Sequence, residues 1–146
     1  MRLLLLEDHG GVAKYFVEEI MSYNIRAVST AQSVADAKSL TATQLFDCYV
    51  VDLNVSTTGL TTAQRSSSAG GKLSGWLWLR HYLSKKDPNW REKTIIYSEY
   101  ISTLRAHVDR KSHKGIPLIR KNLGAEGADM VVECIRAIAR DAGITL

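Results

Sequence analysis

The chain has 146 residues, of which 45% are hydrophobic and 23% charged, with Gly 10 and only Pro 2. These values are typical of soluble globular proteins and exclude disordered and collagen-like classes, and the length suits one domain with its own core, which we expect to span residues 1–146. The formal net charge is +4. Because no helix-turn-helix, aromatic stacking motif or dense basic run accompanies this charge, we expect no direct nucleic-acid binding.

The sequence also indicates the cellular location of the protein. Its longest uninterrupted apolar run, Leu3 to Leu6, is much too short to cross a bilayer, and the segment around it does not resemble a signal peptide. We therefore expect a cytoplasmic protein with no membrane insertion. Cys48 and Cys134 lie far apart without a CxxC or Cys/His cluster, which favours buried thiols over a disulfide or a zinc site.

The first third of the chain predicts strand, helix, strand, helix. Arg2 to Glu7 is a short, almost wholly apolar strand, and the following helix has Val12, Phe16 and Ile20 on one face. Ile25 to Ser29 is the second strand. Ser33 to Leu45 has a serine at its start and Ala and Leu at helical spacings, which indicates the second helix.

The middle of the chain holds a third strand and a long polar segment. Cys48 to Leu53 is again apolar, as expected of a strand in a parallel sheet that is covered on both faces. Ser56 to Ser74 is rich in Ser, Thr and Gly, which predicts a long mobile loop, and we favour a functional lid because structureless loops of this length are uncommon. An apolar helix, Trp76 to Leu83, follows, with one of Trp76 and Trp78 expected in the core and the other exposed.

The last third repeats the alternation. Thr94 to Ser98 and Ile116 to Arg120 are strands, and between them Ile101 to Lys111 has a weak helical pattern. A final helix is marked by an apolar face of Met130, Val131, Cys134, Ile135 and Ile138. Strand and helix thus alternate five times, which predicts a doubly wound α/β domain with right-handed crossovers.

Chemically active side chains follow the strands. In open α/β sheets ligands collect at the carboxyl ends of the strands, where the sequence has Glu7 and Asp8, then Asp52, then Ser98, then Lys121. We therefore expect three carboxylates, a hydroxyl and an amine to converge at one edge of the sheet.

Three close carboxylates oppose one another's ionisation unless a cation is present. Mg2+ suits such a site because it prefers oxygen ligands and keeps several waters. We expect Asp8 and Asp52 to bind the ion directly, Glu7 to hold one of its waters, and the backbone carbonyl of Asn54 to supply another oxygen.

This arrangement predicts phosphoryl transfer to Asp52. Its carboxylate would attack phosphorus, while Mg2+, Lys121 and the Ser98 hydroxyl would stabilise the charge on the phosphoryl oxygens. The product would be an aspartyl phosphate, whose added charge would move Ser98 and the loops around it.

The chain resembles the response-regulator receiver family, through residues 3–9, 49–54, 95–98 and 117–121. The resemblance implies a flavodoxin-like fold with strand order 2-1-3-4-5. It also implies that Glu7 and Asp8 bind Mg2+, that a histidine kinase or histidine phosphotransfer protein phosphorylates Asp52, and that Ser98 and Lys121 contact the phosphoryl group. On this reading the protein is not an enzyme, beyond catalysing its own phosphorylation.

Four features depart from the family pattern. Receivers usually have a glycine soon after the phospho-acceptor strand, whereas Gly75, which takes that place here, comes only after the Ser/Thr/Gly-rich insertion. Glu99 stands where receivers have a small residue.

Leu118 replaces an aromatic residue that moves with the Ser or Thr, so the family's aromatic switch has no counterpart at this position. Tyr97 and Tyr100 are the candidates to substitute for it, although we expect Tyr97 in the core and Tyr100 at the surface. Asn122 replaces a proline, so we expect a trans peptide bond after Lys121.

Parts of the sequence resemble two other classes of function. A phosphohydrolase or nucleotide-binding enzyme is disfavoured because Asn54 stands where a dehalogenase-like motif needs an acid, and Leu73 stands where a Walker A loop needs Ser or Thr. A pseudo-receiver that acts as a phosphorylation-independent interaction module is supported by Glu99, Leu118 and the insertion. The full set of site residues argues against it.

The sequence favours signalling through protein contacts. We expect no output domain after the last helix, and therefore a downstream protein target that binds the face built by the fourth strand, residues 101–111 and the last helix. A homodimer is left open.

Overall fold

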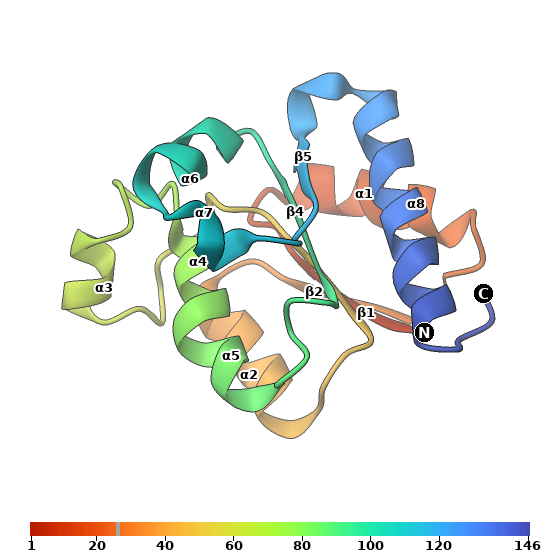
Figure 1. Ribbon diagram of the computed structural model, residues 1–146, viewed down its shortest axis with the longest axis horizontal. Helices are drawn as coiled ribbons and strands as arrows, with labels where there is room; N and C mark the ends of the chain where they lie inside the picture. The colour runs from red at the N-terminus through yellow and green to blue at the C-terminus, as the bar shows by residue number, and fades with distance from the viewer. Residues whose placement is uncertain (26) are drawn as a thin grey trace.

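The computed structural model describes residues 1–25 and 27–146. Its centre is a five-stranded parallel sheet with the order β2-β1-β3-β4-β5, which confirms the predicted fold class (Figure 1). The strands are β1 (Arg2–Leu6), β2 (Ala27–Ala31), β3 (Cys48–Val51), β4 (Thr94–Ser98) and β5 (Leu118–Arg120). The second strand lies two residues later than predicted, and position 26 of the predicted range is outside the described residues.

Helices cover both faces of the sheet, with α1 and α8 on one face and α2, α4, α5 and α6 on the other (Figure 1). They are α1 (Gly10–Met21), α2 (Val34–Thr43), α3 (Thr62–Ser66), α4 (Ser74–Trp78), the π-helical turn η1 (Leu79–Leu83), α5 (Ser84–Lys86), α6 (Ile101–His107), α7 (Arg110–His113), the 3-10 turn η2 (Lys121–Leu123) and α8 (Ala125–Asp141). Within the described ranges, no helix is long and apolar enough to cross a membrane.

Two cores lie on the two sides of the sheet because successive strand side chains point to opposite faces. In β1, Leu3 and Leu5 pack into the cluster under α1 and α8, whereas Leu4 and Leu6 pack into the cluster under α2 and α4. All four side chains are at most 3% exposed, which explains why the strand reads as an uninterrupted apolar run.

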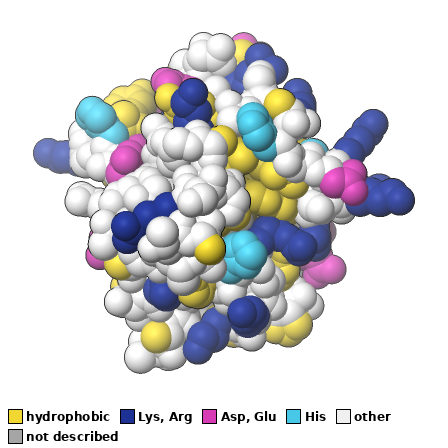
Figure 2. Space-filling view, turned by 90° about the vertical axis from the view of Figure 1, so that its left-hand side faces the viewer, with side chains coloured by type: hydrophobic (Ala, Val, Ile, Leu, Met, Phe, Trp, Pro, Cys, Tyr) yellow, Lys and Arg dark blue, Asp and Glu magenta, His cyan; other side chains and the backbone are white. Residues whose placement is uncertain are grey.

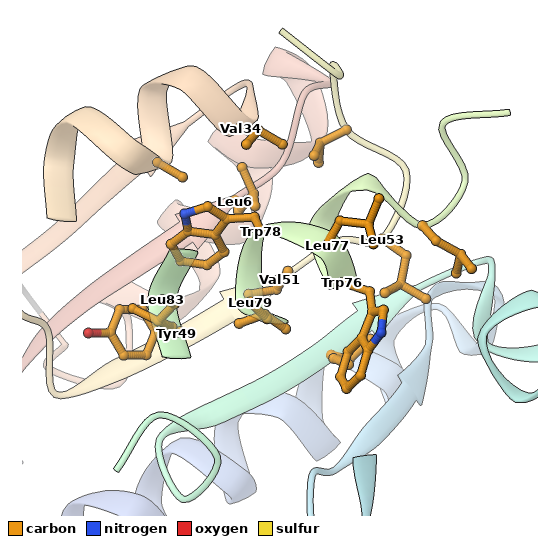
Figure 3. Packing of buried hydrophobic residues seen from close by; sticks show 14 of the residues in the cluster. Leu6, Val34, Tyr49, Val51, Leu53, Trp76, Leu77, Trp78, Leu79 and Leu83 are labelled. Atoms are coloured by element: carbon orange, nitrogen blue, oxygen red, sulfur yellow. The ribbon is translucent and has the colours of Figure 1, made fainter. Parts of the chain in front are cut away.

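The larger core holds both tryptophans of α4, so the expectation of one exposed tryptophan is wrong (Figure 3). Trp78 lies edge-on to Tyr49 of β3 at a ring separation of 6.1 Å. Trp76 points to the other side of α4 and packs on Trp90 and on the imidazole of His113. The side chain of His113 is only 8% exposed. Two opposite faces of α4 are buried because segments distant in the sequence cover them.

Other predicted faces are also corrected. Val12 and Met130 were assigned to buried helix faces but are 38% and 43% exposed. The weak helix predicted for residues 101–111 is two helices, because Val108 is extended and Asp109 caps α7 by accepting a hydrogen bond from the amide of Lys111.

The Ser/Thr/Gly-rich segment 56–74 is folded, which contradicts the prediction of a structureless loop. It contains α3, which begins with a reciprocal capping box between Thr61 and Gln64. Leu60 and Leu73 anchor its two ends in the larger core, where they are 4% and 2% exposed. The hydroxyl of Tyr82 donates to Gln64 Oε1 over 2.9 Å, which ties α3 to η1.

Candidate functional site

The carboxyl ends of β1 and β3 bring the predicted acids together. Beyond the last strand residue, the amide of Asp52 donates to the carbonyl of Leu6 and the amide of Glu7 donates to the carbonyl of Ala31, both over 2.9 Å. These bonds continue the parallel ladder by one residue. They therefore fix the backbone of both acids at the same edge of the sheet.

The three carboxylates form one cluster. Glu7, Asp8 and Asp52 each offer an oxygen, and these oxygens all lie within 4.8 Å of one another. Glu7 and Asp52 are 3% and 7% exposed, whereas Asp8 is exposed. Oxygens on opposite sides of one octahedral Mg2+ lie about 4.2 Å apart, so the cluster has the donor type and nearly the spacing that Mg2+ requires. The residues fit the predicted ion.

Lys121 closes the cluster from the end of β5. Its ammonium lies 2.9 Å from Asp52 Oδ2 and also contacts Glu7 Oε2. Burial acts to lower the pKa of Lys121, but the charge of Asp52 and the hydrogen bond and charge of Glu7 outweigh it and hold this pKa above its ordinary value. Burial raises the pKa of the Glu7 carboxyl, although Lys121 opposes the shift. Lys121 is therefore a charged, positioned donor beside Asp52.

Asp52 is held from below by close backbone packing. The amide of Gly75 donates to the carbonyl of Leu53 over 2.9 Å, and a β-carbon on Gly75 would lie 3.0 Å from the carbonyl carbon of Asp52. The amide of Asn54 donates to Asp52 Oδ1 over 3.3 Å, which orients the carboxylate. Gly75 thus occupies the position that the sequence assigned to it, despite the long insertion before it.

Ser98 lies at the predicted strand end but does not face the open site. Its side chain is fully buried, and its hydroxyl oxygen accepts hydrogen bonds from the amides of Leu53 (3.4 Å) and Tyr100 (3.1 Å). These bonds hold the loop after β3 against the loop after β4. The hydroxyl keeps its own proton to donate. Ser98 does not line the pocket above Asp52, so a contact with a phosphoryl group there requires its side chain to turn toward that pocket.

A cleft of about 220 Å³ opens above the acids. Glu7, Asp8, Asp52 and Lys121 line it, so the predicted convergence is observed for these four residues but not for Ser98. Asn54, predicted to supply a backbone oxygen, also lines the cleft. The sequence placed Val12 in the core and Tyr100 at the surface, yet both line the cleft, together with His9 and Glu99.

Two expectations concern the lining of the cleft: the effect of Glu99 and the role of residues 56–74 as a lid. Glu99 adds a fourth carboxylate to the cleft. No described residue of the segment 56–74 lines it, which does not support the predicted lid. A β-carbon on Gly71 would lie 3.9 Å from Asn54 Oδ1, so the segment passes beside one of the cleft residues.

The geometry defines the chemistry that is available. The buried carboxylate of Asp52 lies between the ammonium of Lys121 and a group of acids suited to a hard divalent cation. Lys121 and a divalent cation held by the acids would together balance the charge of a tetrahedral anion at Asp52. This charge balance is the electrostatic requirement of phosphoryl transfer.

Comparison of the sequence with models of known families and with characterised proteins found no match. Comparison of the structure with solved structures did. The receiver domain of a Francisella response regulator superposes with a TM-score of 0.69 at 17% identity, covering 97% of this chain and 98% of that one. A CheY-like receiver domain from Methanospirillum hungatei gives a TM-score of 0.68 at 13% identity, covering 97% of this chain and 96% of that one.

A third similar structure carries the relevant ion. The receiver domain of a sensor histidine kinase from Pseudomonas aeruginosa, which has magnesium coordinated in its active-site cleft, gives a TM-score of 0.54 at 15% identity and covers 94% of this chain and 97% of that one. The chain therefore has the fold of response-regulator receiver domains over nearly its whole length.

Proposed function

We propose that the protein is a phospho-receiver that accepts a phosphoryl group on Asp52 from a histidine kinase or a histidine phosphotransfer protein. The observation that carries this proposal is the contact of Lys121 with Asp52 inside a cluster of three carboxylates at the carboxyl edge of a receiver-like sheet. A merely structural ion pair has no need of the additional acids, because they make the cluster unfavourable without a further cation.

In the proposed reaction, an oxygen of the Asp52 carboxylate forms a bond to phosphorus as the bond between phosphorus and the donor imidazole breaks. Lys121 donates to a phosphoryl oxygen in exchange for its present contact with Asp52, and the Asn54 amide keeps the carboxylate oriented. Mg2+, held by Asp8 and Asp52 with Glu7 and the carbonyl of Asn54 beside it, would neutralise negative charge on the transferred group. The chain would modify itself and turn over no other substrate.

The signal would then pass through Ser98. The Ser98 hydroxyl now accepts hydrogen bonds from the amides of Leu53 and Tyr100. A phosphoryl group on Asp52 would be a charged acceptor, and the hydroxyl would turn to donate to it. The departure of Ser98 releases the loop that leads into α6. A partner protein that binds α6 and β5 would detect this change.

The test is the intact mass of the protein after incubation with acetyl phosphate, with and without Mg2+. We expect a magnesium-dependent increase that corresponds to one phosphoryl group, and no increase in Asp52→Asn. A folded wild-type protein that stays unmodified with Mg2+ present would overturn the proposal.

The second candidate is a pseudo-receiver that binds partners without phosphorylation. It is favoured by two observations, the engagement of Ser98 by two backbone amides and the presence of the Glu99 carboxylate in the cleft. The same mass measurement separates the candidates, because a pseudo-receiver gives no adduct under either condition.

A further inference from the structure

The segment 56–74 has no part in the proposed reaction, yet it carries a lysine to one wall of the cleft. The ammonium of Lys72 lies 5.8 Å from the centre of the Tyr100 ring, and Tyr100 lines the cleft above Asp52. Lys72 is exposed, and among the described residues it forms no ion pair. Figure 2 faces the side of the molecule that carries α3 of this segment, where Lys and Arg side chains stand on a largely uncharged surface.

The turn that carries Lys72 is fixed to the loop after β3. Ser74 is fully buried, and its hydroxyl oxygen lies 2.6 Å from the carbonyl oxygen of Val55 and accepts from the amide of the same residue over 3.1 Å. On the other side of Lys72, the Gly71 amide donates to the hydroxyl of Ser68 over 3.0 Å, and Ser68 is 1% exposed. The backbone is therefore held on both sides of Lys72, which lowers the entropic cost of presenting its ammonium at one place.

The cleft carries an excess of negative charge before a phosphodonor arrives. Glu99 adds a fourth carboxylate to the three of the acid cluster, whereas Lys121 is the one lysine or arginine among the described residues that line the cleft. Glu99 forms no ion pair with any described residue. Because like charges repel, an anionic donor approaches Asp52 against the field of the Glu99 carboxylate. A further cation beside the entrance offsets this repulsion.

We propose that the segment 56–74 positions Lys72 as a steering residue, whose ammonium attracts the anionic phosphoryl group of the donor toward Asp52. This inference rests on the proposed function and gives the inserted segment a role in it. Lys72 exchanges no proton and forms no covalent bond; it raises the local concentration of the donor at the entrance of the cleft. The later contacts with the phosphoryl group belong to Lys121 and the acid cluster.

The test is the initial rate at which acetyl phosphate, a strongly anionic donor, phosphorylates the full chain at one saturating Mg2+ concentration, followed by intact mass. Lys72→Gln removes the charge, and Lys72→Arg keeps it. Lys86→Gln is the matched control with the same charge change, because Lys86 is exposed at the end of α5. It precedes the start of β4 by a few residues and so lies toward the amino edge of the sheet, opposite the cleft.

We expect Lys72→Gln to react about threefold more slowly than the wild type at about 0.1 M NaCl, the effect of one exposed charge acting over a short distance in water. Lys72→Arg and Lys86→Gln should react at the wild-type rate. The difference should disappear at about 1 M NaCl, where the Debye length falls from about 10 Å to about 3 Å. All variants should reach the same final mass, since Asp52 and the acid cluster are unchanged.

A wild-type rate in Lys72→Gln at both salt concentrations would overturn the steering role and leave phosphorylation of Asp52 standing. A slow Lys72→Gln that stays slow at high salt, or a Lys72→Arg that is equally slow, would assign Lys72 to packing on Tyr100 and overturn the steering role as well. An unmodified wild type would overturn the proposed function itself, and the steering role with it.

Discussion

Gly75 of α4 lies directly against the backbone carbonyl of Asp52, so that a β-carbon at Gly75 would come within 3.0 Å of the Asp52 carbonyl carbon and would overlap its oxygen. This contact lets the first turn of α4 support the end of β3. It also explains how an insertion is tolerated between Asp52 and Gly75: the two residues meet in space at whatever length of chain joins them.

Gly75→Ala should therefore lower the free energy of unfolding by about 1 to 3 kcal/mol, the usual range for overpacking a closely packed site. Urea denaturation measures the change. Gly10→Ala is the control, because its β-carbon would meet nothing closer than 3.8 Å, and an alanine there favours α1. Equal stability of Gly75→Ala and the wild type would show that the close approach is not as described.

Mg2+ should stabilise the folded protein through the acid cluster. At a Mg2+ concentration of about ten times its Kd, binding adds about 1.4 kcal/mol to the free energy of unfolding, which raises the thermal midpoint. Asp8→Asn should lose this rise, since it removes an exposed cluster ligand. Asp129→Asn, an exposed acid on α8, should keep it. The same rise in both variants would contradict the assigned site.

Glu99 should slow phosphorylation by small anionic donors. Its carboxylate lines the cleft, and an unfavourable interaction of about 1 kcal/mol between like charges in water corresponds to about fivefold in rate. Glu99→Ala should therefore react about fivefold faster with acetyl phosphate, as followed by intact mass over time. Glu18→Ala, an exposed acid on α1, should react at the wild-type rate. An unchanged rate in Glu99→Ala would exclude an electrostatic role.

Alkaline pH should destabilise the fold partly through Tyr49. Burial raises the pKa of Tyr49 above its ordinary value of 10.0, so that above this pH the unfolded chain loses the Tyr49 proton while the folded chain keeps it. The folded state then binds more protons, and the free energy of unfolding falls as pH rises above about 10.

In Tyr49→Phe the free energy of unfolding should fall less steeply as pH rises above about 10. At neutral pH the substitution should cost about 1 kcal/mol, because Asp87 and the amide of Phe46 lose their hydrogen bonds to the Tyr49 hydroxyl. Tyr15→Phe, at a 62% exposed position, is the control. Urea denaturation at a series of pH values measures both effects. A wild-type slope in Tyr49→Phe would contradict the linkage.

The strand order and the acid cluster could be predicted because both depend on local features. Buried parallel strands appear in the sequence as apolar runs. The residues that follow such runs meet at one edge of the sheet. This placed Glu7, Asp8, Asp52 and Lys121 correctly. The burial of Trp78 and His113 could not be predicted in this way, because segments far away in the chain cover them.

Two further differences have specific physical causes. Leu60 and Leu73 are isolated among Ser, Thr and Gly, so composition concealed the two anchors that fold the segment between them. The direction of Ser98 depends on the amides of Leu53 and Tyr100, which no residue pattern reveals. The sequence therefore placed Ser98 at the right strand end, but the expectation that its hydroxyl joins the acids at the open site is not met in this structure.

The central claim, that Asp52 itself becomes the aspartyl phosphate, is tested most directly by locating the modification. After incubation with acetyl phosphate and Mg2+, reduction with borohydride converts a phosphorylated aspartate into homoserine, and peptide mass spectrometry identifies its position. We predict homoserine at position 52 alone, dependent on Mg2+. Homoserine at Asp8 or elsewhere, or none in a folded protein, would contradict the account.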